Sequence, residues 1–417
     1  MVTIDGYKIK PNKKIINDVP IQVVYIPLES KMGYSYKPTV KPGDYVCIGS
    51  ILGKNIIAEI PLLSSVSGTV VGFEEKYISN GKIVKCIVIE NDFKEKYLDK
   101  IGKKYDITKY SKDEFIYLLK KCAITEMYNS GYPTYIKYEN TNIKYLIING
   151  VESEAYTSSD SAIMYNNPEE ILECIDAIME IMKIEKAYIA INENNELVIN
   201  KFLKHINTYP NIKIYPVIDA YPSGYERYLI HELLGLSYNN SPQEIGVVCE
   251  NVSTIYAIYE AMKYHKPLIE RLVTISGDGI KEPRNYLLKI GTNFNELLLK
   301  TNNYKKIANP VLICGGAMMG KSLPDDNLII TSDVGTILIL NNQNEEVTEC
   351  IKCGKCSEVC PVNLIPSLII KSKDNALKYN INKCTKCGLC SYVCPAKIEI
   401  KDIIKKMKEE IKWVNII

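Results

Sequence analysis

Eight cysteines near the C-terminus constrain this chain more than any other feature. Residues 350–360 and 384–394 each carry the pattern C-x2-C-x2-C-x3-C followed by a proline. Two-residue spacings let a tight loop bring three thiolates to one face of an iron–sulfur cubane, and in two-cluster ferredoxins the fourth cysteine binds the other cluster. We therefore predict two 4Fe-4S clusters, the first held by Cys350, Cys353, Cys356 and Cys394, and the second by Cys384, Cys387, Cys390 and Cys360.

A pair of zinc sites is the alternative, because zinc also takes four thiolates. Zinc motifs rarely place all four cysteines in one short run that ends in Cys-Pro, and this chain has two such runs. Gly354 and Gly388 lie inside the loops, where backbone amides must approach the sulfides. The other six cysteines are scattered, mostly among apolar neighbours, which favours a reduced compartment over disulfides.

Length and composition exclude several classes of protein. A chain of 417 residues predicts two to four domains. No window approaches the roughly 18 to 20 apolar residues of a membrane span, and the first residues lack the apolar core of a secretory signal, so we expect a cytoplasmic protein. The 51 basic and 49 acidic side chains leave a net charge of +2, which gives no broad field for nucleic acid or an anionic membrane.

The hydrophobic pattern divides the chain into four parts and predicts a multidomain α/β protein. Residues 1–100 alternate short β-branched runs with Gly, Pro, Asn and Asp, and their turns PGDYV and SVSGTVVGF resemble those of barrel-sandwich hybrids. Residues 110–266 alternate apolar strands with helices, which indicates a mostly parallel sheet. Residues 267–342 have the size and order of a β-grasp domain, and residues 345–417 contain the cysteines and a lysine-rich helix.

The barrel-like module shows no lysine at a clear hairpin tip, where biotinyl and lipoyl carriers are modified. We therefore predict a structural role for it. The GDG and CGG strings at residues 277–279 and 314–316 are interpreted as turns rather than phosphate loops.

Nearly the whole chain resembles the RnfC family, one of the subunits of the Rnf electron-transport complex. The resemblance is carried by KPTVKPGDYV, SSVSGTV, IINGVESEAY, AYPSGYERYLIHELLG, CGGAMMG and ECIKCGKCSEVCPVNLIPS. It implies a barrel-sandwich domain, an α/β domain like the flavin-binding subunit of respiratory NADH dehydrogenase, a β-grasp domain of the SLBB type and a helical dicluster domain. It also implies electron exchange with NADH through FMN and two 4Fe-4S clusters, at the cytoplasmic side of a membrane complex.

Two departures from this family weaken the expectation of FMN. Where the family has a loop rich in glycine before Phe-Pro-Thr, this chain has CAITEMYNSGYPTYIK, in which only Gly131 is kept. The side chains at residues 126–129 are expected to fill space that backbone amides need around a phosphate. Where the family has Cys-Glu-Pro, this chain has Ser153, Glu154 and Ala155. The positions that match the family's flavin and NADH pocket are Gly131, Asn149, Glu152, Glu154, Gly224 and Glu226.

These positions have two interpretations: a working pocket, or polar residues that support the fold of a decayed one. We predict weak or absent FMN. The first functional hypothesis is an electron-transfer subunit of an Rnf-type, NADH-linked complex, bound peripherally at the cytoplasmic face of the membrane. The alternative is a soluble paralogue that serves a dedicated reductase, such as a proline reductase, without its own NADH site. A cobalamin-reductase-like relative fits less well, because its domain order differs, and a non-redox scaffold disagrees with eight intact cysteines.

The cysteine pattern generates a direct test of metal content. Protein purified without oxygen should contain about eight iron and eight sulfide per chain, because each 4Fe-4S cluster has four of each. Cys356→Ser should disturb one cluster more than the other in the electron paramagnetic resonance spectrum. Stoichiometric zinc without sulfide would contradict the assignment.

Overall fold

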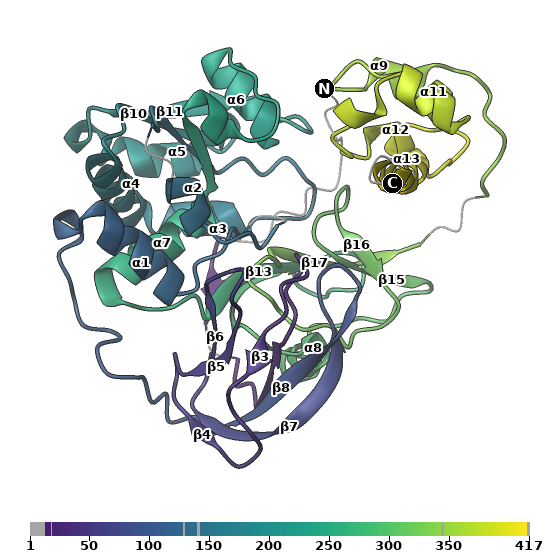
Figure 1. The fold of residues 1–417 in the computed structure, drawn as a ribbon. Coiled ribbons are helices and arrows are strands. Elements are labelled where there is room, and N and C mark those ends of the chain that lie inside the picture. The colour runs from purple at the N-terminus through teal and green to yellow at the C-terminus, as the bar shows by residue number, and fades with distance from the viewer. Residues whose placement is uncertain (1–12, 18, 128–129, 140–141, 343–345, 415–417) are drawn as a thin grey trace.

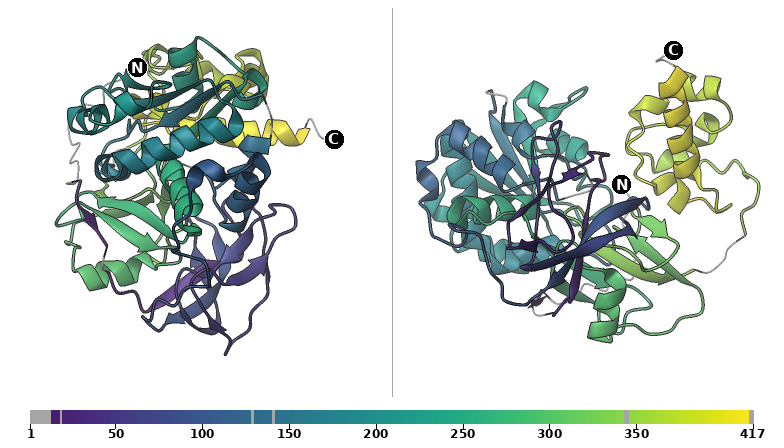
Figure 2. Two further views of the ribbon diagram at one scale, coloured as in Figure 1. Left: turned by 90° about the vertical axis from the view of Figure 1, so that its left-hand side faces the viewer. Right: turned by 60° about the horizontal axis from the view of Figure 1, so that its bottom comes forward.

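The computed structural model describes residues 13–17, 19–127, 130–139, 142–342 and 346–414. Three parts of the chain pack into one body, and the cysteine-rich residues form a smaller lobe beside it, at the upper right of Figure 1. Residues 346–354 run as an irregular segment into this lobe (Figures 1 and 2).

The N-terminal module consists of two antiparallel sheets that face each other. One sheet has the order β2-β8-β7-β4 and the other β3-β5-β6. Their inward side chains, among them Val24, Leu52 and Ile87, are buried in a common core. The strands are β2 (Val23–Pro27), β3 (Lys37–Pro38), β4 (Tyr45–Val46), β5 (Ile51–Lys54), β6 (Pro61–Leu63), β7 (Gly68–Tyr77) and β8 (Ile83–Asn91). Predicted strands in this region therefore form the expected small β module.

The α/β domain contains a parallel sheet in the order β11-β10-β9-β12. Its strands are β9 (Tyr145–Asn149), β10 (Lys186–Asn192), β11 (Ile212–Val217) and β12 (Val247–Asn251). Alternate side chains of a strand point to opposite faces, and both faces here are covered. Leu146 and Ile148 enter the main core, whereas Ile147 packs into a second core with Leu229 and Ile230.

The helices of this domain begin where the sequence provides caps. In α1, Ser111 and Glu114 form a reciprocal capping box, and α4 begins at Pro168 with two acidic residues in its first turn. The helices are α1 (Lys112–Lys121), α2 (Tyr135–Glu139), α3 (Ser159–Asn166), α4 (Pro168–Met182), α5 (Glu196–Leu203), α6 (Glu226–Leu234) and α7 (Val252–Tyr264), with 3-10 turns at Ile107–Lys109, Ile206–Thr208 and Pro242–Ile245.

The β-grasp domain contains a six-stranded sheet in the order β1-β14-β13-β17-β15-β16. Its elements are β13 (Glu270–Ser276), β14 (Arg284–Lys289), α8 (Phe294–Thr301), β15 (Pro310–Cys314), β16 (Lys321–Leu323) and β17 (Thr336–Asn341). The strand, turn, strand and helix predicted for its first half are confirmed.

One strand of the N-terminal region pairs outside the N-terminal β sheets. Strand β1 (Ile15–Ile16), which the sequence placed in the N-terminal β module, pairs in parallel with β14 instead. Ile16 packs against the β-grasp core, and the pairing supplies hydrogen-bond partners to an otherwise open sheet edge.

The C-terminal lobe is built from short helices around a small apolar core. Its helices are α9 (Lys355–Glu358), α10 (Pro366–Ile369), α11 (Lys373–Lys378), α12 (Leu389–Tyr392) and α13 (Ile400–Val414), with a 3-10 turn at Ile381–Lys383. On the lysine-rich helix α13, Ile400, Ile404 and Ile411 point into this core. Within the described residues, no helix has the length and apolar character that crossing a membrane requires.

Two buried tyrosines allow a paired test of core polarity. The Tyr138 hydroxyl in α2 is buried and has no hydrogen-bond partner among the described residues, whereas the Tyr286 hydroxyl accepts a hydrogen bond from Asn303 Nδ2 at 3.2 Å. Because an unsatisfied buried hydroxyl costs free energy, Tyr138→Phe should leave the protein as stable or raise its free energy of unfolding by up to about 1 kcal/mol. Tyr286→Phe should lower it by about 1 kcal/mol. Thermal unfolding midpoints of the two variants check this, and a clear loss of stability in Tyr138→Phe would show that its hydroxyl has a partner.

Candidate functional site

The two cysteine motifs of the C-terminal lobe fold alike. Each begins as a loop and continues into a one-turn helix, α9 or α12, whose N-cap is a glycine in the left-handed region, Gly354 at φ 81° and Gly388 at φ 85°. Lys352 and Lys386, at matching places in the two loops, are also left-handed, at φ 57° and 61°. The repeat seen in the sequence is therefore a repeat in backbone conformation.

The eight thiols border two cavities of the lobe. One cavity, of about 590 Å³, is lined by Cys350, Cys353, Cys356 and Cys394. The other is tighter and is lined by Cys360, Cys384, Cys387 and Cys390. Each cavity thus takes three cysteines from one motif and the last cysteine from the other, as the ligand prediction requires.

The donor set fits iron–sulfur clusters. Thiolates that bind such clusters accept hydrogen bonds from backbone amides. Here the Leu364 N–H donates to Cys360 Sγ at 3.2 Å, and the Lys386 N–H donates to Cys384 Sγ at 3.4 Å. Burial raises the pKa of the Cys390 thiol to about 12, so a thiolate there needs a bound cation. In the described part of the chain, no three His, Cys, Asp or Glu side chains converge as a single metal ion needs.

The second cavity faces the body of the protein. The Tyr221 hydroxyl donates to the backbone carbonyl of Cys387 and lies 2.7 Å from the Tyr225 hydroxyl. Lys401 Nζ donates to the carbonyl of Met318, at 3.0 Å. Tyr221, Met318, Cys387 and Leu389 form one small buried apolar cluster. The lobe is therefore seated on the α/β and β-grasp domains through the side that carries Cys387.

The predicted flavin residues lie at the carboxyl ends of the parallel strands, where open α/β sheets bind ligands. Asn149 ends β9 and donates from Nδ2 to the carbonyl of Gly224 at 2.8 Å. Gly224 has no room for a side chain, because a Cβ there would lie 2.9 Å from the Val151 carbonyl oxygen. The structure thus brings Asn149 and Gly224 together by a bond within the protein.

Glu152 and Glu154 follow β9 but contact different partners. Glu152 accepts hydrogen bonds from the Asp160 N–H, at 2.9 Å, and from the Ser161 hydroxyl at the start of α3. Burial, with the nearby Asp160 carboxylate, raises the pKa of Glu152 to about 7. Glu154 accepts hydrogen bonds from the backbone N–H groups of Met318 and Met319, at 2.7 and 3.2 Å.

The remaining predicted residues, Glu226 and Gly131, have other partners. Glu226, at the start of α6, accepts a hydrogen bond from the Tyr238 hydroxyl, and burial raises its pKa. Gly131 has φ 66° and donates its N–H to the Glu126 carbonyl at 3.2 Å. Met127 is buried, and the predicted obstructions at Tyr128 and Asn129 lie outside the described residues.

The sequence analysis missed a buried charge network beside this loop. Lys137 Nζ in α2 lies 3.1 Å from Glu126 Oε1, 3.3 Å from Glu250 Oε2 and 2.9 Å from the Cys249 carbonyl. Burial alone lowers the pKa of Lys137, but the carboxylates of Glu250 and Glu126 outweigh it and hold that pKa above its ordinary value. The signal was a lysine between Ile136 and Tyr138 in the short helix that follows the loop directly.

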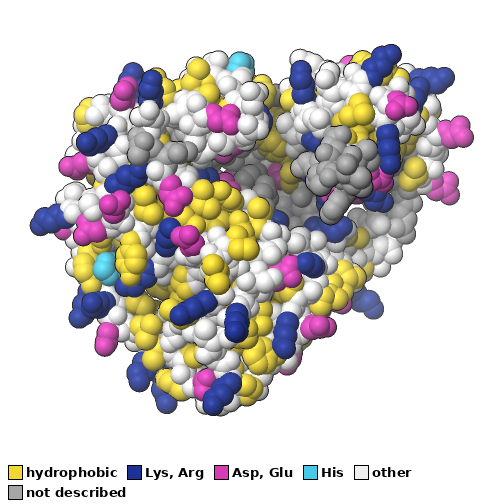
Figure 3. All heavy atoms as spheres, in the orientation of Figure 1, with side chains coloured by type: hydrophobic (Ala, Val, Ile, Leu, Met, Phe, Trp, Pro, Cys, Tyr) yellow, Lys and Arg dark blue, Asp and Glu magenta, His cyan; other side chains and the backbone are white. Residues whose placement is uncertain are grey.

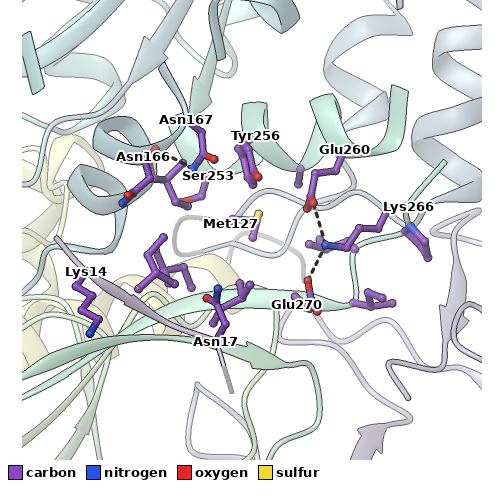
Figure 4. A pocket seen from close by; sticks show the side chains of 18 residues that line it. Lys14, Asn17, Met127, Asn166, Asn167, Ser253, Tyr256, Glu260, Lys266 and Glu270 are labelled. Carbon is purple, nitrogen blue, oxygen red and sulfur yellow. Dashed lines mark hydrogen bonds and ion pairs between the residues drawn. The ribbon is translucent and has the colours of Figure 1, made fainter. Parts of the chain in front are cut away.

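A separate cavity of about 450 Å³ lies between α7 and the β-grasp sheet (Figure 4). Met127, Ser253 and Tyr256 line one side of it. Lys266 bridges Glu260, at 2.8 Å, and Glu270, at 2.6 Å, at one end. None of the six predicted flavin residues lines this cavity, so it is distinct from the pocket that the sequence predicted.

Comparison with known families divides the chain as the fold does. Residues 2–94 match the RnfC barrel sandwich hybrid domain, residues 119–260 the Nuo51 FMN-binding domain, and residues 349–398 a 4Fe-4S dicluster domain. These matches confirm the multidomain fold class and the two 4Fe-4S clusters. The α/β domain is similar to a domain that binds FMN, which makes FMN a possible cofactor.

Relatives align along most of the chain. The C subunit of the proton-translocating ferredoxin:NAD(+) oxidoreductase complex of Clostridium ljungdahlii is 32% identical, over 88% of this chain and 81% of its own length. The C subunit of the Na(+)-translocating complex of Acetobacterium woodii is 29% identical, over 83% and 80%. The C subunit of the ion-translocating oxidoreductase complex of Haemophilus influenzae (strain PittEE) is 29% identical, over 89% of this chain but only 60% of its own length. The chain therefore belongs to the RnfC family, the C subunits of ion-translocating oxidoreductase complexes.

Proposed function

We propose that this chain is an electron-transfer subunit of a redox complex. It passes electrons between a partner redox protein and the other subunits of that complex through two 4Fe-4S clusters. The observation that carries this proposal is the sharing of eight cysteines between two cavities of one small lobe. When bound, such a cluster takes up or releases one electron without making or breaking a covalent bond.

The ligand sets follow from the cavities. We assign Cys350, Cys353, Cys356 and Cys394 to a distal cluster, in the cavity that is bordered by the exposed Cys350 and Cys353. The proximal cluster takes Cys360, Cys384, Cys387 and Cys390. The backbone amides of Leu364 and Lys386 stabilise thiolates of the proximal set, and the Tyr221 hydroxyl holds the Cys387 carbonyl.

The partners are proposed from the names of the relatives. These are C subunits of ferredoxin:NAD(+) oxidoreductase complexes that translocate protons or Na(+). We propose a place in such a complex, in the cytoplasm and peripheral to the membrane, with ferredoxin-type and NADH-linked redox partners. The relatives do not favour the soluble paralogue that serves a dedicated reductase.

The loop before Tyr132 does not fit an FMN phosphate in the described residues. The Glu126 carboxylate accepts hydrogen bonds from the Ser130 hydroxyl and from Lys137 within this loop. The negative charge of Glu126 repels a phosphate. It also pairs with Lys137, the cation that a phosphate would otherwise bind. We therefore propose that FMN binds weakly or not at all to the isolated chain, and that NADH reduces it slowly.

A reductive titration tests the electron-transfer proposal. Protein purified without oxygen should accept about two electrons per chain from dithionite, one for each cluster, as followed by bleaching of the visible absorption. Protein that holds its iron and sulfide but accepts no electrons would contradict the proposed function.

A variant of Glu126 tests the flavin proposal. Glu126→Gln removes one negative charge and one partner of Lys137, which keeps its contacts with Glu250 and the Cys249 carbonyl. The variant should therefore tighten FMN binding by about tenfold, or roughly 1.4 kcal/mol. Quenching of flavin fluorescence during titration measures the affinity. Glu139→Gln is the matched control. Glu139 is an exposed carboxylate at the end of α2, the helix that contains Lys137, and it contacts Lys120 rather than Lys137.

Two results would overturn this interpretation of the loop. One is a full equivalent of FMN bound to the purified wild-type chain, with fast bleaching of the clusters by NADH. The other is an equal change in FMN affinity for Glu126→Gln and Glu139→Gln.

A further inference from the structure

The contact between the C-terminal lobe and the body involves the proximal cysteines and not the distal ones. Tyr221 of the α/β domain is fully buried, and its hydroxyl donates to the backbone carbonyl of Cys387. Among the described residues, no group of the body forms a hydrogen bond with any of the four distal cysteines. The body therefore acts directly on the backbone of the proximal set alone.

Tyr221 is the middle member of a chain of hydrogen bonds. Its hydroxyl lies 2.7 Å from the Tyr225 hydroxyl, and its single hydrogen is directed at the Cys387 carbonyl. The Tyr225 hydroxyl is therefore the donor in the bond between the two tyrosines. Consecutive hydrogen bonds polarise one another, and a buried hydrogen bond is electrostatically stronger than one in water. The positive end of a polarised O–H dipole thus points at the backbone of a proximal ligand.

A second contact between the lobe and the body places a cation beside the proximal cavity. Lys401 in α13 lines that cavity, and its Nζ donates to the Met318 carbonyl at 3.0 Å. Met318 belongs to the loop between β15 and β16, which lies next to the lobe in Figure 1. Its carbonyl oxygen comes close to the second cysteine motif, since a Cβ on Gly388 would lie 3.2 Å from it. Lys401 therefore offsets the negative end of a carbonyl dipole that approaches the proximal loop.

The charges at the proximal cavity favour the arrival of an electron. The charged side chains that line it are Lys386 and Lys401, and no aspartate or glutamate of the described residues lines it. Glu154 of the body interacts with Lys401, but two backbone amides of the β15–β16 loop already bind its carboxylate. Basic and acidic side chains are mixed over the face of the lobe that Figure 3 shows. The outer surface of that face therefore gives no field of one sign, and the effect depends on the groups at the cavity.

A 4Fe-4S cluster gains one negative charge on reduction, so nearby cations and hydrogen-bond donors raise its reduction potential. We propose that Tyr221 and Lys401 are positioning residues that raise the potential of the proximal cluster, Tyr221 through the Cys387 carbonyl and Lys401 through its charge. This inference rests on the proposed function and makes the seating of the lobe part of the electron-transfer site. One electron passes from a reduced partner to the proximal site, the partner is oxidised by one electron, and no proton or covalent bond moves.

Redox potentiometry followed by electron paramagnetic resonance tests this proposal on the full chain, because it measures a midpoint potential for each cluster without turnover. The Cys356→Ser and Cys390→Ser variants identify the distal and the proximal signal, respectively. Dithionite supplies the electrons, and iron and sulfide are measured in every variant.

The tyrosine variants test the hydrogen bond to the proximal ligand. Tyr221→Phe removes only the hydroxyl and should lower the proximal potential, so that the ratio of reduced to oxidised proximal clusters at a fixed applied potential falls about threefold. Tyr225→Phe should lower it less, because the bond from Tyr221 to Cys387 remains. Tyr286→Phe is the matched control, because it removes a buried hydroxyl of the β-grasp domain that bonds to Asn303, and it should leave both potentials unchanged.

The lysine variants test the charge. Lys401→Met should lower the same ratio about tenfold, which is a decrease of about 59 mV in the proximal potential for one electron. Lys401→Arg keeps the charge and should restore most of the wild-type potential. Lys405→Met is the matched control, because Lys405 is an exposed lysine of the same helix that does not line the proximal cavity. In Lys401→Met the distal potential should change by less than half as much as the proximal one.

Three results would overturn the proposal: a wild-type proximal potential in Tyr221→Phe or Lys401→Met, equal shifts of both clusters, or equal shifts in Lys401→Met and Lys405→Met. If Tyr221→Phe does not hold its iron, Tyr225→Phe and the Lys401 variants decide. Variants that hold and reduce both clusters at wild-type potentials would refute the role of Tyr221 and Lys401 alone. A wild-type chain that holds its iron and sulfide but accepts no electrons would refute the electron-transfer function instead.

Discussion

The loop between β15 and β16 is the point at which three domains meet. The Glu154 carboxylate of the α/β domain accepts hydrogen bonds from the amides of Met318 and Met319 in this loop. Lys401 of the C-terminal lobe donates to the Met318 carbonyl on the other side. A Cβ on Gly316 would lie 2.0 Å from Glu154 Oε2, so the approach depends on glycine. A residue of the predicted flavin pocket therefore positions the iron–sulfur lobe.

This arrangement changes the meaning of the retained polar residues. Asn149 bonds to the carbonyl of Gly224, Glu152 bonds at the start of α3, and Glu154 bonds to the β-grasp loop. Each bond joins two separate segments of the chain. These residues therefore support the packing of the α/β domain whether or not a flavin binds.

Local sequence patterns predicted the helices and strands. They did not predict contacts between residues that lie far apart in the sequence. The apolar periodicity of α4 and α7 and the apolar run of β10 were sufficient, because burial of apolar side chains decides these elements. The spacing of the cysteines predicted which three of each motif share a cavity, because the loop geometry is local. The exchange of the fourth cysteine was predicted only from the known arrangement of two-cluster ferredoxins. By contrast, the pairing of β1 with β14 joins residues that lie far apart in the sequence, and no local pattern encodes it. The Lys137 network was missed for the same reason, since Glu126 and Glu250 come from separate elements.

The exchange of the last cysteine between the two motifs has a consequence for how the lobe matures. Each cavity is bordered by thiols from both repeats, so neither repeat contains a complete site. The two halves must therefore be synthesised and brought together before either inorganic centre can be enclosed, which couples cofactor insertion to closure of the lobe. Loss of one repeat by truncation would leave the cavity of the other repeat with three of its four thiols. The lobe is thus an indivisible unit of assembly, even though its sequence looks like two separable copies.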